Sequence, residues 1–397
     1  MSELICTPGL TIVHSASADA LFHAHENASK VILLTSLALD KADIFRNGLY
    51  QNIFILYNMF AALGYKPIML VEKTIESTGA VELFNGYRAI ALSAFIAKPF
   101  YVYTIIEVAL GLPVQLRDQF RSIGARTCKL YLGNIINIDS EMLTTITGQT
   151  INHHMAGSLD AVWTSPHYAP NVEYAAVINS DIYGVAPPAR VVPYVWSPMF
   201  IPADASRYIT VPTGTIGRGF TIIEPNISFQ KCSLIPLMIL ENIYRKCPEL
   251  VSEVIIINGD KLLTSVYFET VICAGLHLVR DGRVRFLPRK TILEITREWP
   301  SNIVVANQIL NEYNYIMMEL LHLGFPYVHN CASLADYGYY YAGSDIDAGT
   351  TAAERAASTH DQRTEAVRAE AAQLTWKFSP YNPEILREWA CILQIQK

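Results

Sequence analysis

The sequence is poor in charge and has no long apolar run. Charged residues make up 17% of its 397 residues. No run reaches the ~18 consecutive apolar residues that a membrane-spanning helix needs. The most apolar stretch, residues 89–114, is interrupted by Lys98, Pro99 and Glu107. The sequence therefore predicts no spanning helix, although a hydrophobic fraction of 51% leaves peripheral membrane contact open.

The sequence has no excess of positive charge, and its first residues do not have the pattern of a secretory signal. The sequence has 30 Lys and Arg against 36 Asp and Glu, a net charge of −6, so nucleic acid is not an expected partner. Its seven cysteines form no C-x-x-C pair and no zinc-site spacing. The first residues, MSELICTPGLTIVHS, contain neither the basic region nor the apolar stretch of a signal peptide. A cytoplasmic protein is expected.

Two nucleotide-binding motifs are missing. The polar loop before Gly48 contains no G-x-G-x-x-G, the fingerprint of a dinucleotide site. No G-x-x-x-x-G-K-[ST] occurs anywhere, which excludes a P-loop NTPase, and a kinase is not expected.

What the sequence does contain is a repeated alternation of strand and helix patterns. Residues 31–39 form a short continuous apolar run, typical of a strand buried on both faces, and apolar residues three and four apart predict a helix over 49–63. Alternation of this kind predicts an α/β protein with two doubly wound, Rossmann-like parallel-sheet domains facing across a cleft. Further helices are predicted in the region up to Gly124, over 262–274, over 351–373 as a solvated helix, and over 384–394.

The domain boundaries follow from a change in composition. Residues 196–219 are rich in proline and glycine, which predicts a hinge over 197–219 between an amino-terminal domain, 1–196, and a carboxyl-terminal domain, 220–375. Residues 376–397 carry a final helix whose Trp389 is expected to pack back on the amino-terminal domain.

Polar residues that follow strands are the candidates for ligand binding, because open α/β sheets bind ligands at the carboxyl ends of their strands. Gly48 begins a helix after the first strand. In the second domain, the loop Asn307–Asn314 leads into a helix carrying Glu319, whose carboxylate could accept hydrogen bonds from the two hydroxyls of a ribose. The alternative is a glutamate on the helix surface.

Lys231 and Arg289 are the candidate cations for an anionic ligand, with exposed surface charges as the alternative. Asp345 and Asp347 form a D-x-D that precedes a predicted helix, where capping or solvation is the expected role, so no metal is expected. Candidate catalytic residues are His154 and His167, either of which could act as a base or bind an acceptor.

The residues 304–330 resemble the nucleotide-sugar segment of GT-B glycosyltransferases, including an uncharacterised group from bacteria and large DNA viruses. The resemblance rests on the helix ending in Glu319-x-x-x-x-Gly-x-Pro, on Tyr327-Val328-His329-Asn330 and on Gly338-Tyr339-Tyr340-Tyr341. It extends to Asn47-Gly48 with Gln51-Asn52, to Pro193 with Trp196, Pro198 and Phe200, and to Glu224-Pro225-Asn226-Ile227-Ser228 with Lys231. In one subgroup of these enzymes, a pair of glutamates stands eight positions apart, and Glu319 matches the second of the pair. At the position of the first glutamate this sequence has Asn311.

This resemblance implies a hexosyl- or pentosyltransferase that uses a nucleotide-diphosphate sugar as co-substrate, without another cofactor, in glycan or glycoprotein synthesis. The second domain would hold the donor and the first the glycan or glycoprotein acceptor. The expected donor-binding residues are Gly48, Asn226, Lys231, Arg289, Asn311, Asn314, Tyr315, Glu319, His329 and Asn330. The alternatives are a nucleotide-sugar epimerase, a non-catalytic two-domain binding protein, and a transferase that has lost turnover.

Overall fold

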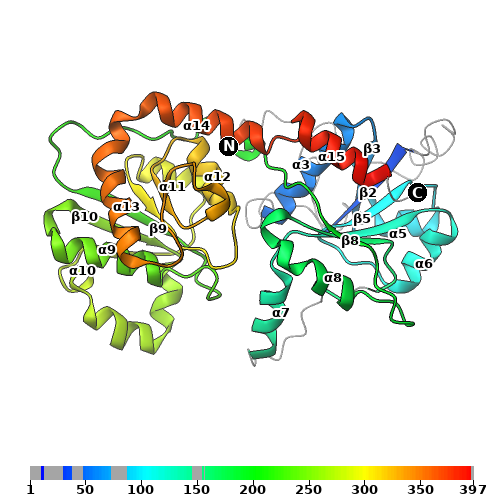
Figure 1. Cartoon of the computed structure of the whole chain (residues 1–397), viewed down its shortest axis with the longest axis horizontal. Coiled ribbons are helices and arrows are strands. Elements are labelled where there is room, and N and C mark those ends of the chain that lie inside the picture. The colour runs from blue at the N-terminus through cyan, green and yellow to red at the C-terminus, as the bar shows by residue number, and fades with distance from the viewer. Residues whose placement is uncertain are drawn as a thin grey trace. The chain divides into compact units, whose positions relative to one another are not determined.

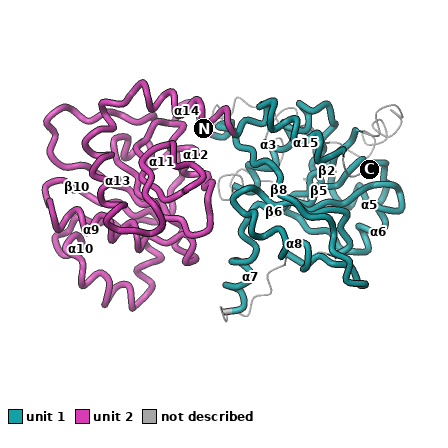
Figure 2. Tube along the Cα trace, viewed as in Figure 1, with its two compact units in different colours: residues 1–200, 378–397 teal, residues 201–377 magenta. Residues whose placement is uncertain are grey.

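The chain folds into two compact units (Figure 1). The computed structural model describes residues 10–12, 30–37, 48–72, 87–144, 154–155 and 157–394. Figure 2 shows unit 1, which comprises Met1–Phe200 and Phe378–Lys397, and unit 2, which comprises Ile201–Lys377. The last helix of the chain therefore belongs to the same unit as the first strands.

The described part of unit 1 is built on an eight-stranded sheet in which every strand pairs parallel to its neighbours. The strand order is β1-β4-β3-β2-β5-β6-β7-β8. The strands are β1 (Leu10–Ile12), β2 (Val31–Ser36), β3 (Lys66–Val71), β4 (Tyr87–Ala91), β5 (Thr104–Glu107), β6 (Arg126–Tyr131), β7 (Ala161–Thr164) and β8 (Ala189–Val191). The α-helices are α3 (Gly48–Ala62), α5 (Leu92–Ala97), α6 (Val114–Ser122), α7 (Ile135–Thr144), α8 (Val172–Ile178) and α15 (Pro383–Gln394).

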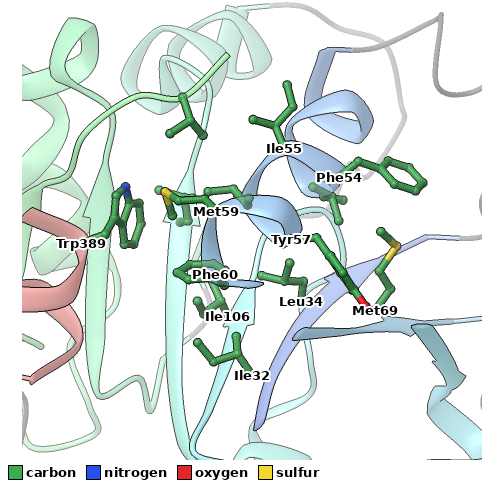
Figure 3. Packing of buried hydrophobic residues seen from close by; sticks show 14 of the residues in the cluster. Ile32, Leu34, Phe54, Ile55, Tyr57, Met59, Phe60, Met69, Ile106 and Trp389 are labelled. Atoms are coloured by element: carbon green, nitrogen blue, oxygen red, sulfur yellow. The ribbon is translucent and has the colours of Figure 1, made fainter. Parts of the chain in front are cut away.

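The helix α15 contributes Trp389 to the core of unit 1 (Figure 3). The indole is fully buried and meets Phe60 of α3 and Trp163 of β7 edge to face, with ring centroids 5.5 Å apart in both cases. Its Nε1 donates to the carbonyl of Pro193 at 3.2 Å. The one polar group of the ring is thus satisfied while its large apolar surface is removed from water.

Unit 2 contains a six-stranded parallel sheet in its described residues, in the order β11-β10-β9-β12-β13-β14. The strands are β9 (Arg218–Ile223), β10 (Val251–Ile257), β11 (Val284–Leu287), β12 (Ile303–Val305), β13 (Tyr327–His329) and β14 (Tyr339–Tyr340). The α-helices are α9 (Leu234–Lys246), α10 (His277–Arg280), α11 (Ile292–Glu298), α12 (Tyr315–His322), α13 (Ile346–Thr359) and α14 (Thr364–Lys377).

The order of the strands in unit 2 reverses between β9 and β12. From β9 the chain adds β10 and β11 on one side, and then β12, β13 and β14 on the other. The helices on the two sides of such a reversal leave the strands in opposite directions, which opens a crevice at the carboxyl ends of the two central strands. A ligand site is therefore expected beside the residues that follow β9 and β12.

Some local predictions are wrong. The region up to Gly124 is not one long helix, because Thr104–Glu107 forms the buried strand β5 between α5 and α6. Residues 262–274 form short 3-10 and π turns instead of an α-helix. The predicted solvated helix, residues 351–373, is divided between α13 and α14 at His360.

The helix α13 is not solvated on all sides. Its residues Ala352, Ala353 and Ala356 are buried against α9 and the sheet. At Gly349 an added Cβ would lie 2.4 Å from Cδ1 of Ile239, so the glycine allows the two helices to approach closely.

In the part of the chain that the structure describes, no helix is both long and apolar enough to cross a membrane.

Candidate functional site

A polar cluster lies at the carboxyl ends of the central strands of unit 2. Glu224 directly follows β9 and is completely buried. Gln308 follows β12, and its side-chain amide Nε2 donates to both carboxylate oxygens of Glu224, at 2.8 and 2.7 Å. The cluster therefore occupies the point at which the strand order reverses.

Lys231 is the cation associated with this cluster. Burial raises the pKa of the Glu224 carboxyl to about 8, against the opposing effects of the Lys231 charge and of the hydrogen bonds from Gln308 and the Asn307 backbone. Burial also lowers the pKa of the Lys231 ammonium, although the charge of Glu224 acts in the opposite direction. Both shifts have the same cause. Glu224 is buried and Lys231 is half-buried, so each charged form has lost water, and the charge of the other residue does not fully compensate for that loss.

The loop that presents Lys231 is held by its own main chain and by Asn226. Lys231 forms antiparallel bridges with Ser228 and Gln308. Asn226 has a φ of 51°, a left-handed conformation that asparagine tolerates better than most residues. Its side chain accepts from the backbone N–H of Ser233 at 2.8 Å and donates to the carbonyl of Asn258 at 3.2 Å. These contacts fix the turn between β9 and α9.

Two further predicted residues join the cluster through Gln308. Asn311 donates to Oε1 of Gln308 at 3.0 Å. Asn330, which follows β13, accepts from the Gln308 N–H at 2.8 Å and donates to the Gln308 carbonyl at 2.9 Å. The structure thus brings Asn226, Lys231, Asn311 and Asn330 to one edge of the sheet, from loops after three different strands.

The helix α12 carries the next three candidates. Asn314 is its N-cap, and the side chain accepts from the N–H of Ile316. Tyr315 is its first residue. Glu319 is only 6% exposed, so the alternative of a glutamate on the helix surface is wrong. Burial of a carboxylate costs free energy unless its oxygens accept hydrogen bonds or pair with a cation. The burial of Glu319 therefore favours a specific polar role for its carboxylate.

His329 and Arg289 lie differently. His329 is buried in β13, with Nε2 2.7 Å from the carbonyl of Tyr337 and Nδ1 accepting from the N–H of Cys331 at 3.2 Å. Burial lowers the pKa of this imidazole to about 4, so the ring is neutral near pH 7. Both ring nitrogens thus bind the main chain. Arg289 is exposed in the loop after β11, the edge strand.

The other candidates belong to unit 1. Gly48 is the first residue of α3. His154 has its Nδ1 2.6 Å from one carboxylate oxygen of Asp139, whose second oxygen accepts from the hydroxyl of Tyr174 at 2.7 Å. The ring of His167 packs against Tyr168, with centroids 3.9 Å apart. Of the two histidines, His154 has the acidic partner that a general base commonly uses to orient its ring.

The D-x-D motif has a structural role at its first residue. Asp345 is the N-cap of α13, and its side chain accepts from the N–H of Ala348 at 2.9 Å, which confirms the capping interpretation. Asp347 accepts from the side-chain amide of Asn242. Among the described residues, no three His, Cys, Asp or Glu side chains are grouped so that they could hold a metal ion.

The sequence interpretation missed Glu224 and Gln308 as site residues. Glu224 does carry a local signal, because a charged residue immediately after the apolar strand FTII stands where parallel strands present their ligands. Gln308 carries no comparable signal. Its importance arises from the pairing of β9 with β12, which brings it to a carboxylate 84 positions away.

Residues 32–393 match the family described as "Protein of unknown function (DUF2827)". The chain belongs to this family. No curated protein matches its sequence.

Solved structures that are similar to the chain include a sucrose-phosphate synthase, a protein bound with UDP-2-fluoro glucose and an O-GlcNAc transferase. The sucrose-phosphate synthase of Thermosynechococcus elongatus is 13% identical, with a TM-score of 0.54 over 92% of this chain and 99% of that one. The trehalose-6-phosphate protein from E. coli, bound with UDP-2-fluoro glucose, is 10% identical, with a TM-score of 0.56 over 91% and 98%. The chain spans only 56% of the pneumococcal O-GlcNAc transferase GtfA, at 14% identity and a TM-score of 0.40 over 74% of this chain.

At these identities the likeness shows the fold and nothing finer. The chain has the GT-B fold, with two parallel-sheet α/β domains, and the predicted fold class is confirmed.

Proposed function

We propose that this chain is a glycosyltransferase that moves a hexosyl or pentosyl group from a nucleoside-diphosphate sugar to an acceptor hydroxyl in glycan or glycoprotein synthesis. The observation that carries the proposal is the cluster of the buried Glu224 with the half-buried Gln308 and Lys231 at the strand reversal of unit 2. A GT-B fold supports the same reaction class.

Lys231 would bind the diphosphate. Glycosyl transfer places negative charge on the departing diphosphate, and a fixed cation that stabilises it lowers the barrier. The Lys231 ammonium has lost water, and burial lowers its pKa more than the charge of Glu224 raises it. A diphosphate beside it would supply that charge and restore the ordinary basicity of the amine. With a lysine in this place, we propose that transfer needs no metal.

The remaining candidates of unit 2 would hold the other parts of the donor. We propose that Glu319 accepts hydrogen bonds from the two ribose hydroxyls, while Asn226, Asn311 and Asn330 shape the loops around the diphosphate and the sugar. Asn314, Tyr315, His329 and Arg289 would support these contacts within unit 2. We propose Gly48, the first residue of α3 in unit 1, as a further donor-binding residue. Since His329 binds only the main chain, its part would be to position the end of β13.

Unit 1 would hold the acceptor. His154 is our candidate for the base that removes the proton from the acceptor hydroxyl, because Asp139 fixes the tautomer that leaves Nε2 basic. His167, which packs among tyrosines, is the second candidate for acceptor binding. The single cysteines of the described chain, free of disulfides, support a reducing compartment such as the cytoplasm.

The test begins with the binding of nucleotides to the full chain. Thermal-shift screening with nucleoside diphosphates and their sugars should find a stabilising ligand, since a ligand at 100 times its Kd stabilises by about 2.7 kcal/mol. UDP and UDP-sugars come first, because the E. coli relative carries one. Lys231→Gln should weaken the binding of the nucleotide at least tenfold. Lys246→Gln, which removes an exposed lysine of the same unit, should leave it unchanged.

Transfer is then measured as release of the nucleoside diphosphate with a panel of acceptors. Binding of a nucleotide sugar without turnover would favour a non-catalytic binding protein or a transferase that has lost activity. Conversion of the donor sugar without transfer would favour an epimerase. If no nucleotide or nucleotide sugar binds, or if Lys231→Gln binds as tightly as the parent, the proposed function is wrong.

A further inference from the structure

A cavity lies at the amino ends of the strands of unit 2, opposite the ends that carry Glu224 and Gln308. It has a volume of about 340 Å³, within the range of small-molecule sites. Its wall is formed by the segment before β9, the carboxyl end of α12 and the first half of α14, and Figure 1 shows α12 and α14 beside each other. Its lining includes Arg207, Tyr208, His322, Val367, Arg368 and Ala371.

Among the described residues, those that line the cavity include two arginines and no carboxylate. Arg207 and Arg368 both contribute to the wall. His322 also lines it, but burial and the Arg207 charge lower the pKa of its imidazole, so the two arginines are the cations of the site. The Arg207 guanidinium donates to the carbonyl of His322 at 3.3 Å. Within the described residues, no carboxylate lies within 4.0 Å of Arg207, so its charge is not neutralised by an ion pair.

Two acidic residues that are adjacent in sequence to lining residues, Asp361 and Glu365, are already engaged. Asp361 accepts from the hydroxyl of Tyr208 at 2.7 Å with one oxygen and from Arg218 at 2.8 Å with the other. Glu365 pairs with Arg368 at 2.8 Å, but both side chains are exposed, and such surface pairs contribute only about 0–1 kcal/mol. Arg368 is therefore available to a ligand that offers a better-matched anion.

The lining also has an apolar part. Val367, Ala371 and Ala372 of α14 and Leu323 after α12 form most of the remaining wall. A ligand that fits must therefore combine an anionic group for the guanidinium groups with a small organic body for this wall. Two guanidinium groups match the charge of a phosphate monoester, about −1.5 to −2 near pH 7, and guanidinium binds phosphate through paired hydrogen bonds.

We infer that this cavity binds a small organic phosphate, held by Arg207 and Arg368. The site is separate from the proposed donor site, because its wall includes Tyr208 and Thr210 ahead of β9 and Leu323 and Gly324 ahead of β13, at the amino ends of these strands. Glu224 and Gln308 lie beyond the carboxyl ends of β9 and β12. The strand β9, six residues long, spans about 17–20 Å between its two ends. The inference does not depend on the proposed glycosyl transfer.

Phenyl phosphate is a suitable probe, since it joins a phosphate monoester to a compact apolar body. Calorimetric titration of the full chain should show saturable binding of one equivalent at millimolar concentrations or below. Phenol, which lacks the anion, should not bind, and benzoate, with a single negative charge, should bind more weakly than phenyl phosphate. Equal binding of benzoate would overturn the assignment to a phosphate.

Variants locate the site. Arg207→Gln should weaken the binding of phenyl phosphate at least tenfold. Ala371→Met should do the same by filling the cavity without changing its charge. Arg283→Gln is the matched control, because Arg283 is another exposed arginine of unit 2 that donates to a main-chain carbonyl, that of Ser252 at 3.1 Å. It should bind phenyl phosphate like the parent.

Lys231→Gln separates the two sites of unit 2. It should leave phenyl phosphate binding unchanged even though it is expected to weaken nucleotide binding. If phenyl phosphate failed to bind the parent, if Arg207→Gln and Ala371→Met bound it normally, or if Lys231→Gln abolished binding, the cavity would not be the site. Far-UV circular dichroism of each variant checks that the fold is retained.

Discussion

The side-chain amide of Gln308 lies 2.8 and 2.7 Å from the two carboxylate oxygens of Glu224. The two residues follow β9 and β12, which are adjacent in the sheet although their sequence positions differ by 84. One amide group thus ties together the two loops that border the strand reversal. The remaining hydrogen-bond partners of Gln308, Asn311 and Asn330, extend this link to the loop before α12 and to the end of β13.

The stability of the chain should depend on pH through Glu224. The pKa of its carboxyl is about 8 in the folded chain against an ordinary value of 4.5. The folded state therefore binds this proton more tightly, and its contribution to stability is lost as the pH rises toward 8. Glu224→Gln cannot ionise, so we expect it to match the parent near pH 5 and to exceed it by a few kcal/mol, in order of magnitude, near pH 8.

Thermal unfolding of both proteins across this pH range measures the difference. Glu253→Gln is the control, since Glu253 forms a partly exposed pair with Arg285 and should change the pH profile little. Parallel profiles for the parent and Glu224→Gln would show that Glu224 is ionised throughout.

Glu319→Gln should weaken donor binding with little effect on folding. The substitution keeps the size of a side chain that is only 6% exposed and removes the charge that strengthens hydrogen bonds to hydroxyls. The loss of a charge-assisted hydrogen bond costs on the order of 1.5–3 kcal/mol, or about ten- to a hundredfold in Kd. Calorimetry with the nucleoside diphosphate measures it. Glu298→Gln, an exposed change in the same unit, serves as the control, and equal affinity for Glu319→Gln and the parent would rule out the ribose role.

Transfer should persist in EDTA. The proposed neutralisation of the diphosphate by Lys231 needs no divalent ion, and Asp345 is already used as the cap of α13. Activity is measured after dialysis against chelator and again after addition of manganese. If activity were lost completely in chelator and restored by manganese, a metal ion rather than Lys231 would neutralise the diphosphate. Asp345 and Asp347 would then be the residues to substitute.

His154→Gln should slow transfer without weakening donor binding. General-base catalysis typically contributes about 10²- to 10⁴-fold, and the effect should fall on kcat. Asp139→Asn, which keeps the shape but weakens the orientation of the ring, should cause a smaller loss. His277→Gln, at an exposed histidine of unit 2, is the control. Unchanged kcat in His154→Gln would leave His167 as the next candidate.

Removal of the Trp389 ring should destabilise unit 1. The ring is fully buried between Phe60 and Trp163, and truncation of a buried tryptophan to alanine typically costs 3–5 kcal/mol. Trp376→Ala, at a position that is 55% exposed, should change stability by less than about 0.5 kcal/mol. Urea unfolding followed by circular dichroism compares the two. Similar midpoints for both variants would show that α15 contributes little to the core.

The amino-acid sequence by itself determined much of the regular structure. Apolar runs such as Val31–Ser36 and Val254–Ile257 predict buried strands because both faces of a parallel sheet must be covered. The strand and helix alternation therefore predicted the fold class, and the position of Asp345 before a helix predicted its capping role. These features depend on residues that are close together in the sequence.

Only the tertiary structure decided which distant residues meet. The strand β5 lies where a helix was predicted, because strand pairing with β2 and β6 supplies hydrogen bonds that a local pattern does not reveal. The burial of Glu319 and the binding of both His329 nitrogens to the main chain depend on packing between elements. Glu224 meets Gln308 because β9 and β12 are neighbours in the sheet. The order of the strands follows from the burial of both faces of the sheet, not from the residues at the strand ends.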